Sequence, residues 1–355
     1  MAAVTKQRDS NIELFRIVLM LMIIAHHYVV NSGVEALYDF NRVIGNQLFL
    51  ELWGWGGKVG VNCFLLVTGY FMCQKQFTWR KFLKLYLEVK FYKLAIALIF
   101  VLVGRQALTL DYCFKSVFNV ALLMGTTFSA TFIALFLLIP FINRLIGVMD
   151  KKTHGCLLLV LLLIYTVIGT LINRLFGDDI VWFVTVYLIG AYISLYATPK
   201  MNSLKRTATW AVLALALSLA SIVVITFIPQ LNSRMSVYFF VFNANRVLAI
   251  ASAVAFFLFF KNLDLGHNRL INLAASATFG VLLIHANSDI SSWLWGDVLN
   301  VKGQLTSNLL WLHAILSCLG IYIVCVVIDI LRQGLLERPL FAWLDNRFPA
   351  LNKPY

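Results

Sequence analysis

Residues 11–31 read NIELFRIVLMLMIIAHHYVVN, and this stretch decides the fold. It is apolar over about 20 residues, the length that an α-helix needs to cross the hydrocarbon core of a bilayer. Arg16, His26 and His27 interrupt the apolar run. No small-residue cleavage site follows the apolar run, so we expect a retained transmembrane helix and not a secretory signal peptide.

Similar apolar stretches recur along the rest of the chain. Only helices satisfy their backbone groups at such lengths in lipid, because the alternating pattern of a closed barrel is not visible. We therefore expect an all-α, polytopic integral membrane protein with about ten transmembrane helices. The remaining predicted spans are roughly 58–74, 88–104, 127–148, 155–173, 180–197, 208–228, 236–260, 273–294 and 308–331.

The composition agrees with a membrane location. Of 355 residues, 61% are hydrophobic and only 13% are charged, whereas a soluble domain has roughly 25% charged residues. No polar segment is long enough for a soluble domain, so we expect one membrane-embedded domain over residues 1–355. The six cysteines show neither a CxxC pair nor a Cys/His spacing, which argues against a metal site or a disulfide framework.

The formal charge of +13 is spread over short segments between the apolar runs, which argues against a nucleic-acid partner. With the N-terminus in the cytoplasm, the inner segments hold eighteen Lys and Arg residues and the outer segments hold seven. Because cytoplasmic loops carry the excess of Lys and Arg, both termini are predicted to be cytoplasmic.

Ionisable groups in a span cost free energy to insert and are functional hypotheses by default. Arg16 and His27 are eleven residues apart, close to three full turns, so they share one face of the first helix and lie about 16 Å apart along it. Glu13 is three residues before Arg16 and can pair with it. His26 points about 100° away from His27, and we expect it to be structural. The alternative for Arg16 is that it only snorkels to the inner headgroups.

Polar residues also lie in later spans. Asn62, with Thr68 and Gly69, is typical of close helix packing. Arg246 stands several residues inside the eighth span and should face a polar cavity or an acid. His285 lies in the outer half of the ninth span, at a depth comparable with His27, and it can equally be a satisfied interhelical histidine. His313 and Asp329, near opposite ends of the last span, are predicted to be interfacial.

The segment 77–93, FTWRKFLKLYLEVKFYK, spaces bulky apolar residues among Lys and Arg. This pattern is typical of an amphipathic helix at the membrane surface. It can act as a cationic anchor that fixes topology, or it can attract an anionic cofactor from the cytoplasm. Both roles are compatible.

The stretch NIELFRIVLMLMIIAHH resembles the opening of the acyltransferase type 3 family, bacterial membrane proteins that O-acylate surface polysaccharides and related molecules. In that family an arginine is followed eleven positions later by a histidine, a pattern that Arg16 and His27 match and that selects His27 over His26. The resemblance extends to residues 60–72, 182–196 and 277–289. Many members have arginines entering the third span, whereas this chain is rich in lysine there.

The resemblance implies a multi-pass protein of the bacterial plasma membrane that uses cytoplasmic acyl-CoA, with acetyl-CoA expected, and a hydroxyl acceptor such as a surface glycan. His27 is then the general base, and His285 orients the acceptor or stabilises the oxyanion. No metal is expected. The residues expected to hold the phosphates of CoA are Arg16, Arg80, Lys81, Lys84, Lys90 and Lys93, and those expected at the substrate are Glu13, Asn62 and Arg246.

Two other functions fit an intramembrane arginine and histidine. A transporter or a flippase of lipid-linked sugars also places such residues along a substrate pathway. It should show inverted repeats with broken spans in corresponding positions, and this sequence shows no such pair. A structural scaffold gives no reason for Arg16 and His27 to share a helix face.

Overall fold

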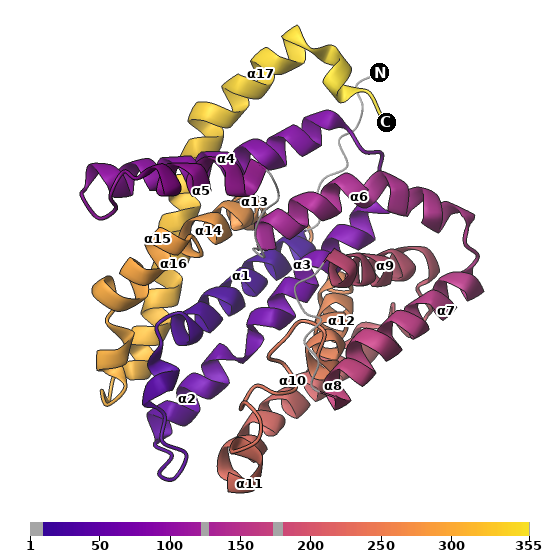
Figure 1. Cartoon of the computed structure of the whole chain (residues 1–355). Coiled ribbons are helices and arrows are strands. Elements are labelled where there is room, and N and C mark those ends of the chain that lie inside the picture. Colours follow the sequence, from indigo (N-terminus) through magenta and orange to yellow (C-terminus); the bar gives the residue numbers. More distant parts are fainter. Residues whose placement is uncertain (1–9, 122–127, 173–179, 355) are drawn as a thin grey trace.

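The computed structural model describes residues 10–121, 128–172 and 180–354, and it is built from helices (Figure 1). Within these ranges the one pairing of β type is an isolated bridge between Thr78 and Pro354. The α-helices of five or more residues are α1 (Ser10–Val30), α2 (Gly45–Trp53), α3 (Gly57–Met72), α4 (Trp79–Leu102), α5 (Leu110–Ala121), α6 (Phe128–Val148), α7 (Lys151–Leu162), α9 (Ile180–Tyr196), α10 (Leu204–Phe227), α12 (Val247–Lys261), α13 (Arg269–Ser276), α14 (Thr278–His285), α15 (Ser288–Ser292), α16 (Leu310–Arg332) and α17 (Arg338–Arg347).

Several helices begin at residues that cap their free N–H groups. The Thr78 hydroxyl accepts from the Lys81 amide at the start of α4, and an oxygen of Asp150 accepts from the Thr153 amide at the start of α7. Such caps stabilise a helix by about 0.5–2 kcal/mol. They place the start of α4, and with it the lysine-rich segment, at a defined position.

Five helices in the described ranges are long and apolar enough to cross a membrane, and a bent pair makes six if it is one span. The five are Ser10–Val30, Phe128–Val148, Lys151–Leu171, Leu204–Phe227 and Leu310–Arg347, where the third continues through α8 (Gly169–Leu171). Two further apolar helices, α9 and α12, are shorter. The chain is therefore an all-helical membrane protein in these ranges, while the count of ten spans stays a prediction.

Every one of the ten predicted stretches contains a helix, but two differ from the expected form. The eighth stretch was expected over 236–260, whereas α12 begins only at Val247. Residues 236–246 form turns because Asn245 and Arg246 donate hydrogen bonds to backbone carbonyls near α8, which a regular helix at this place would not allow.

The ninth stretch, expected over 273–294, is a broken helix. Two segments, Arg269–His285 and Ser288–Gln304, meet at an angle of 73°. The bend follows from capping, because the Asn287 side chain accepts a hydrogen bond from the Asp289 amide and starts α15 in a new direction. His285 is the last residue before this bend.

Helix α1 lies at the centre of the molecule (Figure 1). Its Phe15 and Leu19 belong to a core cluster with α3, α6, α9 and α12, and its Ile24 and Tyr28 belong to a second cluster with α4, α14 and α16. Over half of its span, 56%, is buried, compared with 28–33% for the other four candidate spans. Both faces of α1 are thus covered by protein.

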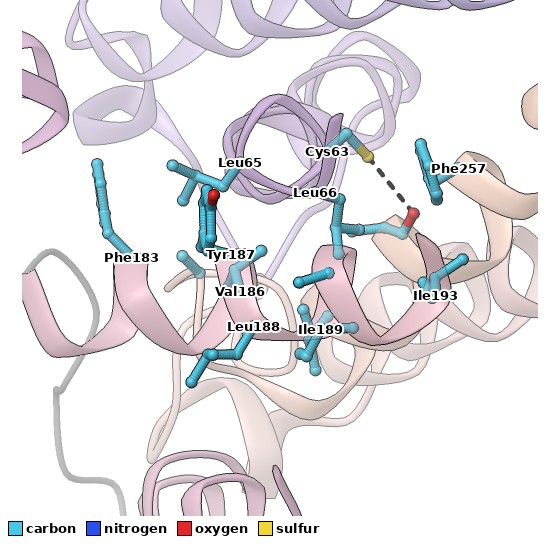
Figure 2. Packing of buried hydrophobic residues seen from close by; sticks show 14 of the residues in the cluster. Cys63, Leu65, Leu66, Phe183, Val186, Tyr187, Leu188, Ile189, Ile193 and Phe257 are labelled. Atoms are coloured by element: carbon cyan, nitrogen blue, oxygen red, sulfur yellow. Dashed lines mark hydrogen bonds between the residues drawn. The ribbon is translucent and has the colours of Figure 1, made fainter. Parts of the chain in front are cut away.

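Helices α3 and α9 approach each other at backbone distance. A Cβ atom added to Gly69 would clash with the Tyr187 carbonyl, and one added to Gly190 would lie 2.5 Å from the Leu66 oxygen. Small residues are common where membrane helices pack closely, because packing and not the hydrophobic effect drives their association. Figure 2 shows the result, with Leu65 and Leu66 of α3 against Tyr187 of α9.

Candidate active site

A cavity of about 1080 Å³ lies beside α1. Its walls come from α1, α3, α4, α6 and α14, and from the residues after α14 and before α12. On α1, the side chains of Arg16, Met20, Ile23 and His27 line it, spaced as one helix face requires. The arginine and the histidine that share a face therefore also share one cavity, about 16 Å apart along the helix axis.

The Arg16 end of the cavity is cationic. Lys81 and Lys84 of α4 line it together with Arg16. Ser276 and Gln333 also line the cavity, and the Gln333 side chain donates a hydrogen bond to the Ser276 carbonyl. Arg16 donates to Glu13 at 3.3 Å, and the Glu13 carboxyl is buried. Glu13 is not among the described residues that line the cavity. It contacts Arg16 directly, and its predicted contact with substrate stays a prediction.

Not all of these lysines are equally available. The Lys84 ammonium lies 2.6 Å from the Glu337 carboxylate, and Lys81 donates to the Gln76 carbonyl at 3.0 Å. Lys93, three turns further along α4, lines the cavity as well. An anion bound at this end would meet Arg16, Lys81 and Lys84, with Lys84 shared between the anion and Glu337, whereas Lys93 lies further along the cavity.

The middle of the cavity is apolar. Its walls include aromatic rings from three elements, Phe64 of α3, Phe132 of α6 and Phe279 of α14, together with Leu282 and Leu283. A hydrocarbon chain would lose little hydration free energy there, whereas a charged group would lose much. The apolar middle of the cavity therefore lies between its two polar ends.

The His27 end is lined by groups that both donate and accept hydrogen bonds. They are the amides of Asn31, Asn243 and Asn287 and the hydroxyl of Ser288, with Glu35 and Lys58 as the charged members. Burial raises the pKa of the Glu35 carboxyl above its ordinary value, and the neighbouring Glu51 raises it further. This end is suited to a ligand that is rich in hydroxyl groups.

His27 and His285 are brought into hydrogen-bond contact. His27 Nδ1 lies 3.1 Å from His285 Nε2, and His285 Nδ1 lies 2.6 Å from the Val281 carbonyl oxygen. His285 is fully buried and is not among the described residues that line the cavity, so it lies behind His27 as seen from the cavity. A direct contact of His285 with acceptor, expected from the sequence, has no support in this arrangement.

His26 was expected to point away from the site, but its ring also lines the cavity. Its Nδ1 donates to the Gly54 carbonyl at 2.6 Å, and a Cβ atom at Gly57 would clash with the ring. Because α3 begins with glycine beside this ring, the cavity extends around α1 far enough to reach both histidines.

Besides Glu13 and His285, four further predicted site residues lie outside the cavity lining that the structure describes, namely Asn62, Arg80, Lys90 and Arg246. Arg80 forms a two-bond ion pair with Asp345 of α17, at 2.7 and 2.9 Å. Asn62 is fully buried, donates to the Ala244 carbonyl and accepts from Trp182. Contacts with other helices occupy the polar groups of Arg80 and Asn62, and their contact with donor or substrate stays a prediction.

Arg246 is nearly fully buried and donates to the Gly169 and Thr170 carbonyls at 2.9 and 3.3 Å. These carbonyls belong to the last turn before the end of α8, where Arg246 supplies side-chain donors to them. Among the described residues, these polar contacts of Arg246 are with backbone carbonyls, and Arg246 is not part of the described cavity lining.

Asp329 was predicted to be interfacial and is instead fully buried. It accepts from Tyr92 and Arg332, each at 2.7 Å, and Arg332 also binds Glu88 at 3.0 Å. A Cβ atom at Gly280 of α14 would clash with the Asp329 carboxyl, so α14 covers it at backbone distance. This charged cluster, which joins α4, α14 and α16 beside the Arg16 end, was missed because an acid near a span end usually reaches water.

The family model described as an acyltransferase domain matches residues 9–330 of the chain. This chain belongs to the acyltransferase type 3 family. No curated protein and no solved structure matches it. The match covers α1 to α16 and ends before α17, so Arg16, His27 and His285 of the acyltransferase all lie within it.

Family and fold together identify a membrane acyltransferase. The cavity of this acyltransferase has a cationic end, an apolar middle and an end with two histidines, on the helix where the sequence pattern placed Arg16 and His27. Lys58, Asn31 and Asn287 were not singled out from sequence. Their signal was weak, because each stands at the end of a helix where polar residues are common.

Proposed function

We propose that the protein transfers an acyl group from acyl-CoA to a hydroxyl group of a surface glycan or a related acceptor, with His27 as the general base. Acetyl-CoA is the donor that we propose first. The observation that carries the proposal is the single cavity that has Arg16 at one end and His27 at the other. A base-catalysed transfer from acyl-CoA needs both a site for the anionic donor and a base beside the acceptor.

The donor is proposed to bind at the cationic end. The phosphates of CoA are anions, and Arg16 offers a guanidinium that can form two parallel hydrogen bonds to one phosphate. Lys81, Lys84 and Lys93 add positive charge along α4. The apolar middle then accommodates the pantetheine arm, which carries the thioester towards His27.

The acceptor is proposed to bind at the end lined by Asn31, Asn243, Asn287 and Ser288. Amide and hydroxyl groups recognise sugar hydroxyls by donating and accepting hydrogen bonds. His27 takes the proton from the attacking hydroxyl while its oxygen bonds to the thioester carbonyl carbon. The carbon–sulfur bond then breaks, and His27 returns the proton to the CoA thiolate. The products are an ester and CoA.

The basic residues place the Arg16 end in the cytoplasm in our proposal, because cytoplasmic segments carry most Lys and Arg. Acyl-CoA then enters from the cytoplasm of a bacterium, and the acceptor is met near the outer leaflet. Neither a metal nor a nucleic acid takes part. The lipid bilayer surrounds the apolar helices of the protein.

The test uses membrane vesicles that contain envelope glycans and either the wild-type chain, His27→Ala or His26→Ala. Vesicles receive ¹³C-labelled acetyl-CoA, and free CoA and the masses of the glycans are measured. Base catalysis contributes roughly 10²–10⁴ in rate, so His27→Ala should lose most labelling. His26→Ala should keep substantially more. Equal labelling in wild type and His27→Ala would exclude His27 as the base.

The same assay separates a transporter from an acyltransferase. A flippase of lipid-linked sugars moves its substrate without a covalent change, so the glycan masses would stay constant and no CoA would be released. Succinyl-CoA in a parallel reaction tests the acyl group, since its extra carboxylate would have to pass the apolar wall formed by Phe64, Phe132 and Phe279.

A further inference from the structure

Behind His27 lies a chain of two hydrogen bonds that ends at the backbone of α14. His27 Nδ1 is 3.1 Å from His285 Nε2, and His285 Nδ1 is 2.6 Å from the Val281 carbonyl oxygen. The rings of the two histidines are 5.1 Å apart and tilted by 46°. Each nitrogen in this chain has one partner, so the direction of each bond can be worked out from the end that is fixed.

The fixed end is the Val281 carbonyl. A carbonyl oxygen only accepts, so His285 Nδ1 must carry the hydrogen. A neutral imidazole has one N–H group, and the other nitrogen, Nε2, therefore holds a lone pair. His27 Nδ1 faces that lone pair and must donate to it. With its hydrogen on Nδ1, neutral His27 has its own lone pair on Nε2.

The opposite direction is ruled out by the same distances. If His285 donated from Nε2, its unprotonated Nδ1 would lie 2.6 Å from the Val281 oxygen, with two lone pairs facing each other. A doubly protonated His285 would place a charge in a fully buried ring. In the described part of the chain no carboxylate forms a hydrogen bond or an ion pair with this ring, and an unpaired buried charge is costly.

We infer that His285 is a positioning residue that fixes His27 in the tautomer with hydrogen on Nδ1 and so makes Nε2 the basic atom. This inference rests on the proposed role of His27 as the base. His27 lines the cavity and His285 lies behind it, so the fixed tautomer leaves the lone pair for the cavity side. In a histidine, which nitrogen is basic depends on the bond that the other one makes.

The bond persists through the reaction. The acceptor hydroxyl gives its proton to His27 Nε2 as its oxygen bonds to the thioester carbon. His27 is then an imidazolium whose Nδ1–H still donates to the lone pair of His285. When the carbon–sulfur bond breaks, the Nε2 proton goes to the CoA thiolate, and His27 returns to its starting tautomer. His285 keeps its single proton throughout.

His26 provides an internal comparison. Its Nδ1 donates to the Gly54 carbonyl at 2.6 Å, so the backbone alone fixes its tautomer. Substitution of His285 should leave His26 unchanged, although the two histidine rings at positions 26 and 27 are only 6.0 Å apart. A general disturbance of α1 would alter both rings, whereas the loss of one acceptor would alter His27 alone.

The direct test is ¹⁵N NMR of the full chain in lipid nanodiscs, with label in the imidazole nitrogens. The chain has six histidines, and the signals of His27 and His26 are assigned by their loss in His27→Gln and His26→Gln. We expect wild-type His27 to carry hydrogen on Nδ1. In His285→Leu we expect a mixture of tautomers at His27 and no change at His26.

The kinetic test uses labelled acetyl-CoA and envelope vesicles. His285→Leu should lower kcat by about 10- to 100-fold, the usual effect of removing a partner that orients a functional imidazole, and leave the KM for acetyl-CoA unchanged. His285→Gln keeps a carbonyl that can accept from His27 Nδ1, so it should recover most of the rate. This rescue and the split between kcat and KM would not follow from a purely structural role.

The outcomes separate this inference from the proposed function. Hydrogen on His27 Nε2 in the wild-type protein overturns the inference, even if His27→Ala is inactive. Hydrogen on Nδ1 together with full activity of His27→Ala overturns the proposed function and keeps the tautomer assignment. If His285→Leu does not fold, the wild-type spectrum and the His285→Gln rate still decide the question.

Discussion

At the scale of single residues, Arg16 and His27 define the two ends of one path. They lie about 16 Å apart along α1, so a donor whose phosphates bind Arg16 has to extend through the apolar middle of the cavity to bring its thioester to His27. Coenzyme A has this form, with phosphates at one end and a thiol at the end of a long arm. The distance between the residues therefore selects for an extended donor.

Substitution of Arg16 by Lys tests whether donor binding needs the shape of the guanidinium or only its charge. Lysine keeps the positive charge but cannot form two parallel hydrogen bonds to one phosphate. A hydrogen bond to a charged group is worth about 1.5–3 kcal/mol, so the KM for acetyl-CoA should rise about 10-fold or more. Steady-state rates in vesicles at varied acetyl-CoA give this value.

Arg80→Lys is the matched control for that experiment. Arg80 was a predicted donor ligand, yet its guanidinium binds Asp345 and does not line the described cavity. The KM of this variant should equal that of the wild type. A rise in KM for Arg80→Lys, with none for Arg16→Lys, would reverse our placement of the donor.

At the scale of helices, the charged cluster around Arg332 holds α16 against α4. Arg332 binds Glu88 of α4, Asp329 of its own helix and Glu337 just after it, and all four groups are largely buried. Removing one partner of a buried pair costs about 3–5 kcal/mol, because the remaining charge loses its compensation. Arg332→Met should therefore lower the unfolding free energy by about that amount.

Arg80→Met is the control for the stability loss in Arg332→Met, since it also removes an arginine that joins α4 to the C-terminal region. Its pair with Asp345 is about one-third exposed, and exposed pairs contribute about 0–1 kcal/mol. Thermal unfolding of both variants in the same detergent measures the difference. Equal losses of stability would mean that burial does not set the strength of these ion pairs.

The contact between α3 and α9 allows a second test at this scale. Gly69→Ala would push a methyl group into the Tyr187 carbonyl, and such overpacking costs about 1–3 kcal/mol. Gly320→Ala in α16 meets no atom within 4 Å and should stabilise its helix by about 0.5–1 kcal/mol. Melting temperatures of the two variants should move in opposite directions from the wild type.

Sequence reasoning worked where the relevant distance is short along the chain. The first helix was expected over 11–31 and is found at Ser10–Val30, because its apolar run has clear ends. The common face of Arg16 and His27 follows from helical spacing alone. The ion pair of Arg16 with Glu13 is equally local, and the packing role of Gly69 depends only on residue size.

The rest depends on contacts between distant segments. Residues 236–246 are apolar enough for a helix, but Arg246 binds carbonyls 76 and 77 residues earlier in the chain. Arg80 and Lys81 are neighbouring basic residues that the sequence does not distinguish. In the structure Arg80 binds Asp345 of α17, whereas Lys81 lines the cavity. The contact of His27 with His285 spans 258 residues. Periodicity and hydropathy carry no information about such pairs.

At the scale of the whole molecule, the direction in which the cavity crosses the membrane decides which substrate comes from which side. The excess of Lys and Arg predicts that the Arg16 end faces the cytoplasm. Single cysteines, introduced at Lys302 and at Lys200 in a chain without its native cysteines, test this with a reagent that cannot cross membranes. Lys302→Cys should react in intact cells, and Lys200→Cys only after the cells are opened. The reverse pattern would place the donor end outside.

The central position of α1 also has a consequence for synthesis. His27 of this helix is synthesised 258 residues before its hydrogen-bond partner, His285. At about 5–20 residues per second, a ribosome needs roughly 10–50 s to supply it. During that interval the newly made arginine and histidine are in the membrane without the helices that enclose them. A nascent chain released before α14 therefore has Arg16 and His27 but lacks the partner that would fix the tautomer of the proposed base.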